Sequence, residues 1–414
     1  MADELSLESE FDIQTIRQQF PILDRQIGGK PLVYLDSAAS SQKSDFVLDA
    51  MSNQARTAYS NVHRGLHTLA NETTDAFEKA RELVRSHLNA KSVDEVIFTK
   101  GATEAINLVA SGLAETIKAG DEIMVSVMEH HSNIVPWHFL RERFGAVIKW
   151  IEVSEDGSLD MESFRTQLSQ KTRIVAVTHM SNVLGTVPDV ATIIKEAHDA
   201  GALVLLDGCQ AAVHLEIDVQ ALDADFYVCS AHKMYGPTGI GALYGKLDIL
   251  SAMRPYQGGG EMIDTVTRNG VTYNAPPHRF EAGTPAILEA VGFGAAVEWM
   301  QKYVTPDARA YKKAVYERLA EGVRGINGLT IHGTAEGKGP VLTFSIEGTH
   351  PHDLAQILDR YGVAIRAGNH CAQPLMSHLK VSATARASVG IYNTLEEADM
   401  FVQALEKARA MLLA

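Results

Sequence analysis

Residues 202–210 read ALVLLDGCQ, and this short apolar run ending in an aspartate is the segment that decides the fold. Four similar runs lie around it: 94–101 (DEVIFTKG), 121–133 (DEIMVSVMEHHSN), 172–185 (TRIVAVTHMSNVLG) and 224–233 (ADFYVCSAHK). Between them, residues 102–120 and 189–201 have the apolar spacing of helices. Continuous apolar strands that alternate with helices predict an α/β fold with a mostly parallel sheet, covered on both faces.

The pattern changes after about residue 290. Helices are predicted at 287–304, 307–326, 350–362 and 395–413, and a strand at 339–348. This mixture indicates a smaller α+β domain. We expect residues 25–292 to form a large domain and residues 1–24 and 293–414 to form the small one, because the first residues precede the first strand, PLVYLD (31–36).

Composition excludes several classes of protein. The net charge of −14 argues against a nucleic-acid partner and against docking on anionic membranes. No apolar run approaches the roughly 20 residues of a membrane span, and the acidic N-terminus lacks the features of a signal peptide. The three cysteines, at 209, 229 and 371, form neither a disulfide framework nor a zinc pattern. We therefore expect a cytoplasmic protein without a metal site.

Polar residues follow each of the five predicted strands. In a parallel sheet, ligands bind at the carboxyl ends of the strands, so these residues are candidates for one shared site. They are Thr99, Lys100 and Thr103; Glu129, His130 and His131; Ser181 and Asn182; Asp207 and Gln210; and Ser230, His232 and Lys233. Each of them alone could be structural, and their common location is what predicts a site.

Lys233 and Asp207 indicate the chemistry. A lysine after a strand is more often a solvated residue, but Lys233 lies between an apolar run and a glycine-rich apolar segment, which favours burial. A desolvated lysine offers a neutral amine, which condenses with aldehydes to form a Schiff base. Asp207 could be a simple cap, or it could hold a proton on a heteroaromatic nitrogen. Pyridoxal phosphate (PLP) needs both such partners.

The cofactor's phosphate needs a binding site as well. The segment KGATEAINL (100–108) places small residues and the hydroxyl of Thr103 at a helix N-terminus, where free amides favour anions. An ordinary helix cap would look the same. Ser230 and His232 flank Lys233 and could supply further donors, and the ring of His130 could lie on the cofactor.

Three motifs carry a resemblance to a known family: SAHKMYGPTGIG (230–241), LLDGCQAAVH (205–214) and VMEHHSNIVPW (127–137). With them the chain resembles the aminotransferase class V branch of fold-type I PLP enzymes. It is most similar to the group II, SufS-type cysteine desulfurases, which overlap with selenocysteine lyases. The resemblance extends from VYLDSAAS (33–40) to ARASVGIYNT (385–394).

The resemblance implies a role for each matching residue. Lys233 would form the internal Schiff base with the cofactor, and Asp207 would contact its pyridine nitrogen. His130 would stack on the cofactor ring, and Gln210 would reach its phenolic oxygen. Thr103, Ser230 and His232 would bind the cofactor's phosphate. Thr284 would reach the cofactor phosphate in the active site of a second subunit, which implies a homodimer with shared active sites. By the same resemblance, Arg386 would bind the substrate carboxylate, and Asn182, Arg366 and His63 would line the substrate side of the site.

Cys371, in RAGNHCAQPL (366–375), is the candidate nucleophile. Cys209 and Cys229 lie in or beside apolar strands and read as buried core, whereas Cys371 lies in a polar loop. Arg366 and His370 are close in sequence and could favour a thiolate. By resemblance, Cys371 attacks the sulfur of cysteine bound to PLP and becomes a persulfide, and L-alanine is released, with His130 as a candidate proton donor.

Two features bear on the sulfur acceptor. Many group II enzymes have histidine where this chain has Asn369, so the thiolate at Cys371 is expected to be less favoured. The loop is short and lacks the serine-rich extension of group I, which implies an acceptor protein that approaches Cys371. The segment GTHPHDLAQ (348–356) resembles members that use a zinc-containing SufU-type acceptor, and we expect His352 to contact it. His352 could equally be part of a solvated helical turn, and a SufE-type acceptor needs no such histidine.

The predicted function is therefore conversion of L-cysteine to L-alanine, with sulfur passed to an acceptor and, indirectly, to a SufBCD-type scaffold for iron–sulfur cluster assembly. A selenocysteine lyase is the nearest alternative, since the two substrates differ only in the chalcogen. Another class V PLP enzyme, such as an aminotransferase, would not need Cys371. A catalytically silent scaffold is disfavoured because Lys233, Asp207 and Cys371 occur together.

Overall fold

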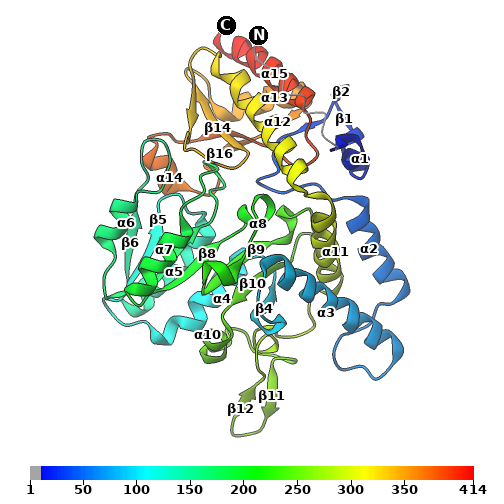
Figure 1. Ribbon diagram of the computed structural model, residues 1–414, viewed down its shortest axis with the longest axis vertical. Coiled ribbons are helices and arrows are strands. Elements are labelled where there is room, and N and C mark those ends of the chain that lie inside the picture. The colour runs from blue at the N-terminus through cyan, green and yellow to red at the C-terminus, as the bar shows by residue number, and fades with distance from the viewer. Residues whose placement is uncertain (1–10) are drawn as a thin grey trace.

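The computed structural model of the protein describes residues 11–414. Its centre is a seven-stranded sheet within those residues (Figure 1). In spatial order the strands are β4 (Val96–Thr99), β10 (Gly241–Gly245), β9 (Phe226–Ser230), β8 (Leu203–Asp207), β7 (Thr172–Thr178), β5 (Glu122–Ser126) and β6 (Val147–Ile151). From β9 to β6 all neighbours are parallel, and only β10 runs antiparallel to both of its neighbours. The predicted α/β fold with a mostly parallel sheet is confirmed.

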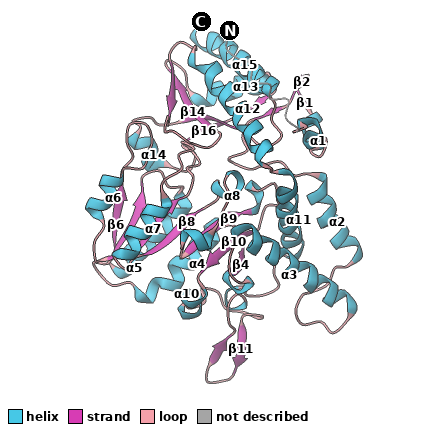
Figure 2. Cartoon of the chain, in the orientation of Figure 1, coloured by secondary structure: helices cyan, strands magenta, loops and turns pink. Residues whose placement is uncertain are grey.

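Helices cover both faces of this sheet (Figure 2). On one face lie α3 (Thr68–Leu88), α6 (Met161–Gln167), α7 (Val190–Asp199), α8 (Ala211–His214) and α11 (Ile287–Tyr303); on the other lie α4 (Ala102–Leu113), α5 (Val135–Phe144) and α10 (Leu247–Ala252). In β8, Val204 and Leu206 join the first core cluster while Leu205 joins the second. Because successive strand residues point to opposite faces, a strand buried on both sides must be apolar throughout.

A second, smaller sheet is antiparallel and lies at the upper end of the molecule in Figure 1. It consists of β13 (Leu329–His332), β14 (Val341–Ile346), β17 (Thr384–Ser388) and β16 (Arg366–Gly368). Its core is shared with α12 (Pro306–Arg324), α13 (Pro351–Arg360) and α15 (Leu395–Leu413). The sheet positions the Cys371 loop, which connects β16 to α14 (Gln373–His378).

The N-terminal segment contacts both parts of the chain. It contains α1 (Ile13–Arg17), the hairpin of β1 (Gln26–Ile27) and β2 (Lys30–Pro31), and β3 (Val33–Tyr34), which pairs in parallel with β15 (Val363–Ala364). Phe20 packs edge-on against Trp299 of α11 and against Tyr392. Arg17 forms an ion pair with Glu397 of α15. The predicted domain boundary at 292–293 falls inside α11, and residues 1–10 of that prediction lie outside the described residues.

The remaining elements lie at the periphery. They are α2 (Asp45–Thr57), which packs on α11, α9 (Val219–Leu222), and the hairpin of β11 (Ile263–Val266) and β12 (Val271–Tyr273), which projects from the lower end in Figure 1. Within residues 11–414, no helix has the length and apolar character needed to cross a membrane.

Candidate active site

Strand ends bring Lys233, Asp207 and His130 into one electrostatic group. Asp207 is the last residue of β8, Lys233 ends the short turn after β9, and His130 follows β5. Burial, with the charge of Lys233 as the next contribution, lowers the pKa of His130 to about 4, while Asp207 acts in the opposite direction. The three residues thus follow the carboxyl ends of β9, β8 and β5 in one sheet, the edge at which the sequence predicted a shared site.

The states of these three groups fit a cofactor site. Asp207 is buried, and its Oδ1 accepts one hydrogen bond, from the Cys209 amide at 3.0 Å. Among residues 11–414, the half-buried Lys233 amine has no hydrogen-bond or ion-pair partner. The amide of Ser132 donates to Nδ1 of His130 at 3.1 Å, which leaves the proton of the neutral ring on Nε2. An amine without a partner beside a buried carboxylate is the pairing that PLP requires.

Hydroxyl and amide groups meet at the N-terminus of α4. Gly101 precedes the helix with a φ of 145°, and the amide of Ala102 donates to Oγ of Ser230 at 3.0 Å. Thr103, in the first turn, is exposed. This is the arrangement expected for a phosphate, since it combines the positive end of a twelve-residue helix with small residues and hydroxyls.

His232 and Gln210 are fixed by the segment that follows β3. The carbonyl of His232 accepts a hydrogen bond from the Ser41 amide at 3.0 Å, and Nδ1 of the His232 ring lies 3.3 Å from Oγ of Ser40. Burial and the charge of Lys233 lower the pKa of His232 to about 4, so the ring is neutral. Gln210 is almost fully buried, and its Nε2 donates to the Ala38 carbonyl at 2.7 Å.

The Cys371 loop has an unusual backbone. His370 and Cys371 are consecutive residues with left-handed φ values of 51° and 58°. Each such conformation costs a residue with a side chain about 1–2 kcal/mol, so the loop needs contacts that hold it. Asn369 supplies two of them: its Oδ1 accepts from the Cys371 amide at 3.0 Å, and its carbonyl accepts from the Ala372 amide at 2.9 Å.

His370 anchors the loop to β17. It is buried, and its Nε2 lies 2.9 Å from Oγ1 of Thr384. Burial and the charge of Arg386 lower the pKa of His370 to about 3, so the side chain is a neutral structural group. Its carbonyl accepts from Nδ2 of Asn182 at 3.0 Å, which ties the loop to the residue that follows β7. His370 is therefore not a cationic partner for Cys371.

One arginine lies next to Cys371, and a second is its partner across the small sheet. Nη2 of Arg366 is 3.8 Å from the Cys371 sulfur, and Cys371 is only partly buried. Arg386 is buried, and it donates to the Asn182 carbonyl at 2.8 Å and to Oδ1 of Asp36 at 3.1 Å. In the described part of the chain, Nε of Arg386 is buried without a hydrogen-bond partner. A buried guanidinium with spare donor capacity is suited to binding a carboxylate.

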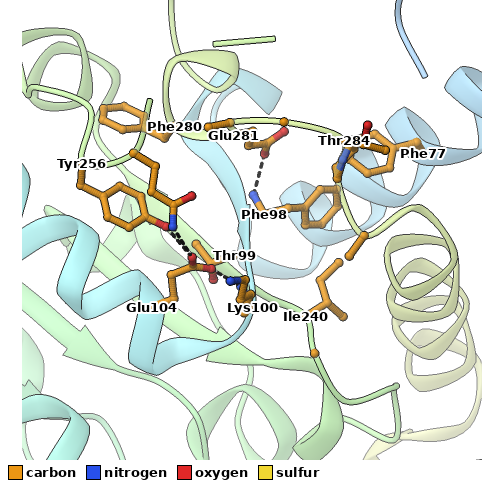
Figure 3. Close-up of a pocket in the computed structure, with 16 residues that line it drawn as sticks. Phe77, Phe98, Thr99, Lys100, Glu104, Ile240, Tyr256, Phe280, Glu281 and Thr284 are labelled. Carbon is orange, nitrogen blue, oxygen red and sulfur yellow. Dashed lines mark hydrogen bonds between the residues drawn. The ribbon is translucent and has the colours of Figure 1, made fainter. Parts of the chain in front are cut away.

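His63 and Thr284 both lie near α3 and β4. His63 pairs with Glu78 at 2.9 Å and contacts the ring of His278. Thr284 is exposed at the edge of a pocket of about 430 Å³, together with Thr99, Lys100 and Glu104 (Figure 3). Within residues 11–414, neither His63 nor Thr284 forms a hydrogen bond or ion pair with Lys233 or Cys371. Thr284 thus shares its pocket with residues at the start of α4, the helix that carries Thr103, whereas His63 is held by Glu78.

A buried ionic network connects the surroundings of His63 and Thr284. Arg81 is fully buried and bonds to Glu78, to the Val96 carbonyl, and to both oxygens of Glu281 at 2.6 and 2.9 Å. Glu281 also accepts from the Phe98 amide at 2.7 Å, as the dashed line in Figure 3 shows. Arg81 therefore fixes the segment that carries Thr284 against β4.

His352 faces the segment that precedes Cys371. His350 and His352 line a cavity of about 400 Å³ with Arg366, Gly368 and Asn369 among its other walls. A Cβ placed on Gly368 would lie 3.6 Å from Nε2 of His352, which shows how closely the imidazole approaches the backbone. In residues 11–414, no group of three or more histidine, cysteine or acidic side chains could hold a metal.

Cys209 and Cys229 are both buried, as expected from their strands. Burial raises the pKa of Cys229 to about 12, which removes it as a nucleophile at neutral pH. Glu129 and His131 were strand-end candidates without a specific role, and Asp36 was not singled out from the sequence. Asp36 ends the run PLVYLD, so the strand-end argument applied to the other strands could have identified it.

Taken together, the fold and these strand-end residues define a PLP enzyme of fold type I. A family model for aminotransferase class-V matches residues 33–401, and the chain belongs to this family of PLP-dependent enzymes. Its relatives include a cysteine desulfurase of Pectobacterium atrosepticum, 45% identical over 97% of this chain and 99% of that protein. A probable cysteine desulfurase of Synechocystis is 47% identical, over 95% and 94% of the two chains.

Solved structures show the same relationship. The cysteine desulfurase CsdA from Escherichia coli, in an S-sulfonic acid form, is 38% identical, with a TM-score of 0.91 over 97% of this chain and 100% of that one. The apo cysteine desulfurase of Thermococcus onnurineus is 34% identical, with a TM-score of 0.90 over 95% and 97% of the two chains. The predicted family, enzyme class and cofactor are confirmed by these matches.

Proposed function

We propose that this enzyme converts L-cysteine to L-alanine, with the sulfur retained as a persulfide on Cys371. The observation that carries the proposal is the position of the Cys371 loop. It bonds to Asn182 after β7 and to His131 after β5, so that a partly exposed thiol lies beside the strand ends that hold Lys233 and Asp207.

The cofactor would be held by residues from several strands. Lys233 would hold its aldehyde carbon, Asp207 its ring nitrogen, Gln210 its phenolic oxygen and His130 its ring face. Thr103, Ser230 and His232 would hold its phosphate. When bound, PLP supplies an electron sink for charge that develops at the substrate Cα.

The chain's own residues would carry out the remaining steps. Arg386 would bind the substrate carboxylate, with Asn182 and Arg366 beside it, and the Lys233 amine would remove the Cα proton. The Cys371 thiolate would attack the substrate sulfur: the S–S bond forms, the substrate C–S bond breaks, and its electron pair goes to Cβ. Alanine is completed when Cβ receives a proton, for which Nε2 of His130 is the assigned donor, and Lys233 returns the proton to Cα. The transfer is balanced and needs no external oxidant or reductant.

The test is incubation of the purified enzyme with L-cysteine and a reductant. Alanine and sulfide should appear in equal amounts, Lys233→Ala should lose both, and Cys371→Ala should lose sulfide. Cys229→Ala, which removes a buried thiol, is the matched control and should retain both products. If Cys371→Ala keeps full sulfide release, Cys371 is not the nucleophile. Selenide release by Cys371→Ala from selenocysteine would indicate a selenocysteine lyase activity.

We propose further that the enzyme is a homodimer with shared active sites. Thr284 is exposed on a pocket that it shares with residues at the start of α4, so it is available to a second copy. The proposed division remains a large domain of 25–292 and a small domain of 1–24 and 293–414. The proposed location is the cytoplasm.

The proposed acceptor is a protein of the SufU or SufE type that delivers sulfur to a SufBCD-type scaffold for cluster assembly. His352 is exposed on the cavity next to Arg366 and Asn369, where an acceptor could reach it. With a zinc-containing SufU-type acceptor, His352→Ala should lose stimulation of turnover while keeping its basal rate. Undiminished stimulation would remove His352 from the acceptor site and favour a SufE-type partner.

A further inference from the structure

His131 forms one hydrogen bond to Cys371 and another to Gln373, on either side of Ala372. Its backbone amide donates to the Cys371 carbonyl at 2.7 Å. Its imidazole Nε2 accepts from the backbone amide of Gln373 at 3.0 Å, at the first residue of α14. The two bonds clamp the residues just before and after Ala372, which is itself fully buried.

The clamp joins the two sheets of the enzyme. His131 follows β5 of the large sheet and is the direct neighbour of His130, whereas Cys371 follows β16 of the small sheet. The other contacts that hold the loop, through Asn369 and Thr384, come from the small-sheet side, so they shape the loop without fixing its position relative to Lys233. Asn182 and His131 are the contacts from the large sheet.

The protonation state of His131 suits this contact. Because Nε2 accepts a hydrogen bond, the proton of the ring must lie on Nδ1 and the ring must be neutral. Burial lowers the pKa of His131, which favours this neutral form. A neutral acceptor on a side chain fixed next to His130 holds the loop at a set distance from the cofactor.

We propose that His131 is a positioning residue that holds the Cys371 sulfur within reach of the substrate sulfur. The proposal rests on the proposed function, and it concerns the step in which Cys371 attacks that sulfur. It predicts that His131 affects sulfur transfer and leaves removal of the Cα proton unchanged, since the latter step uses Lys233.

The test compares three variants of the holoenzyme. His131→Ala removes the imidazole acceptor and keeps the backbone bond, and His131→Gln places an amide oxygen near the position of Nε2. His138→Ala is the matched control, since His138 lines the same cavity as His131 and Gln373 and its imidazole has no hydrogen-bond partner among the described residues. Three quantities are measured: single-turnover persulfide formation, exchange of the Cα hydrogen of L-alanine in D2O, and amide hydrogen exchange of residues 369–373.

His131→Ala should slow single-turnover sulfur transfer roughly five- to tenfold, the effect of losing one hydrogen bond to a partly solvated amide. Its amide exchange at 369–373 should be faster and its Cα exchange unchanged. His131→Gln should recover most of the rate, and His138→Ala should match the wild type. Equal transfer rates in His131→Ala and the wild type would overturn the inference, as would a parallel loss of Cα exchange. A wild type that forms no persulfide would instead overturn the proposed function.

Discussion

Replacing Arg81 with methionine should destabilise the enzyme more than any exposed ion-pair variant. The Arg81 side chain is fully buried, and Glu281, its bidentate partner, is 7% exposed. Burial by itself lowers the pKa of Arg81, but Glu281 and Glu78 raise it overall. The Arg81–Glu281 pair is therefore charged in the folded enzyme. Methionine fills a similar volume but, within residues 11–414, leaves Glu281 with only the Phe98 amide as a donor.

Removing one partner of a buried ion pair costs about 3–5 kcal/mol, because the other charge stays desolvated. Urea unfolding of the holoenzyme should show a loss of that size for Arg81→Met. Lys195→Ala, which breaks an exposed pair with Asp199, is the control and should change the free energy of unfolding by about 0.5 kcal/mol or less. Adding Glu281→Gln to Arg81→Met should recover part of the loss. A loss within about 1 kcal/mol of the control would refute the assignment of Arg81 as a desolvated ionic centre.

Two further predictions concern pH and the Cys371 loop. Burial raises the pKa of Glu129 from 4.5 to about 8, so between these values the unfolded carboxyl loses its proton while the folded one keeps it, and stability falls as pH rises through about 8. Glu129→Gln removes this dependence, so its free energy of unfolding should rise relative to the wild type from pH 5 to pH 8; parallel pH profiles would contradict the assignment. Asn369→Ala removes the acceptor for the Cys371 amide and should slow single-turnover persulfide formation about fivefold, while Asn369→Asp, which keeps an acceptor oxygen, should lose less. An unchanged rate in Asn369→Ala would show that the loop does not need this bond.

The sequence predicts the large sheet well because its strands are buried on both faces. Apolar runs such as 202–210 indicate buried parallel strands when helices lie between them. In the structure Leu205 is buried on one face of the sheet and its neighbours Val204 and Leu206 on the other. β10 (Gly241–Gly245) was not predicted. It follows a glycine-rich segment that resembles a loop, and its role as an antiparallel strand between β4 and β9 depends on contacts distant in sequence.

The site shows a similar division. Residues at strand ends, such as Asp207 and Lys233, are predictable because the topology of a parallel sheet fixes where they meet. Contacts between segments are not predictable in this way: Arg386 bonds to Asp36 across 350 positions, and His131 meets the Cys371 loop only after both sheets are folded. His370 was expected to favour a thiolate, but its burial and its contact with Thr384 show a structural anchor instead.

The most direct measurement is the mass of the peptide that contains Cys371 after a single turnover. The enzyme is mixed with one equivalent of L-cysteine, its thiols are alkylated, and the three cysteine peptides are compared with the alanine released. We predict one added sulfur atom on Cys371 for each alanine formed, and neither product in Lys233→Ala. Alanine formed while Cys371 stays unmodified, or sulfur carried by Cys209 or Cys229, would contradict the account.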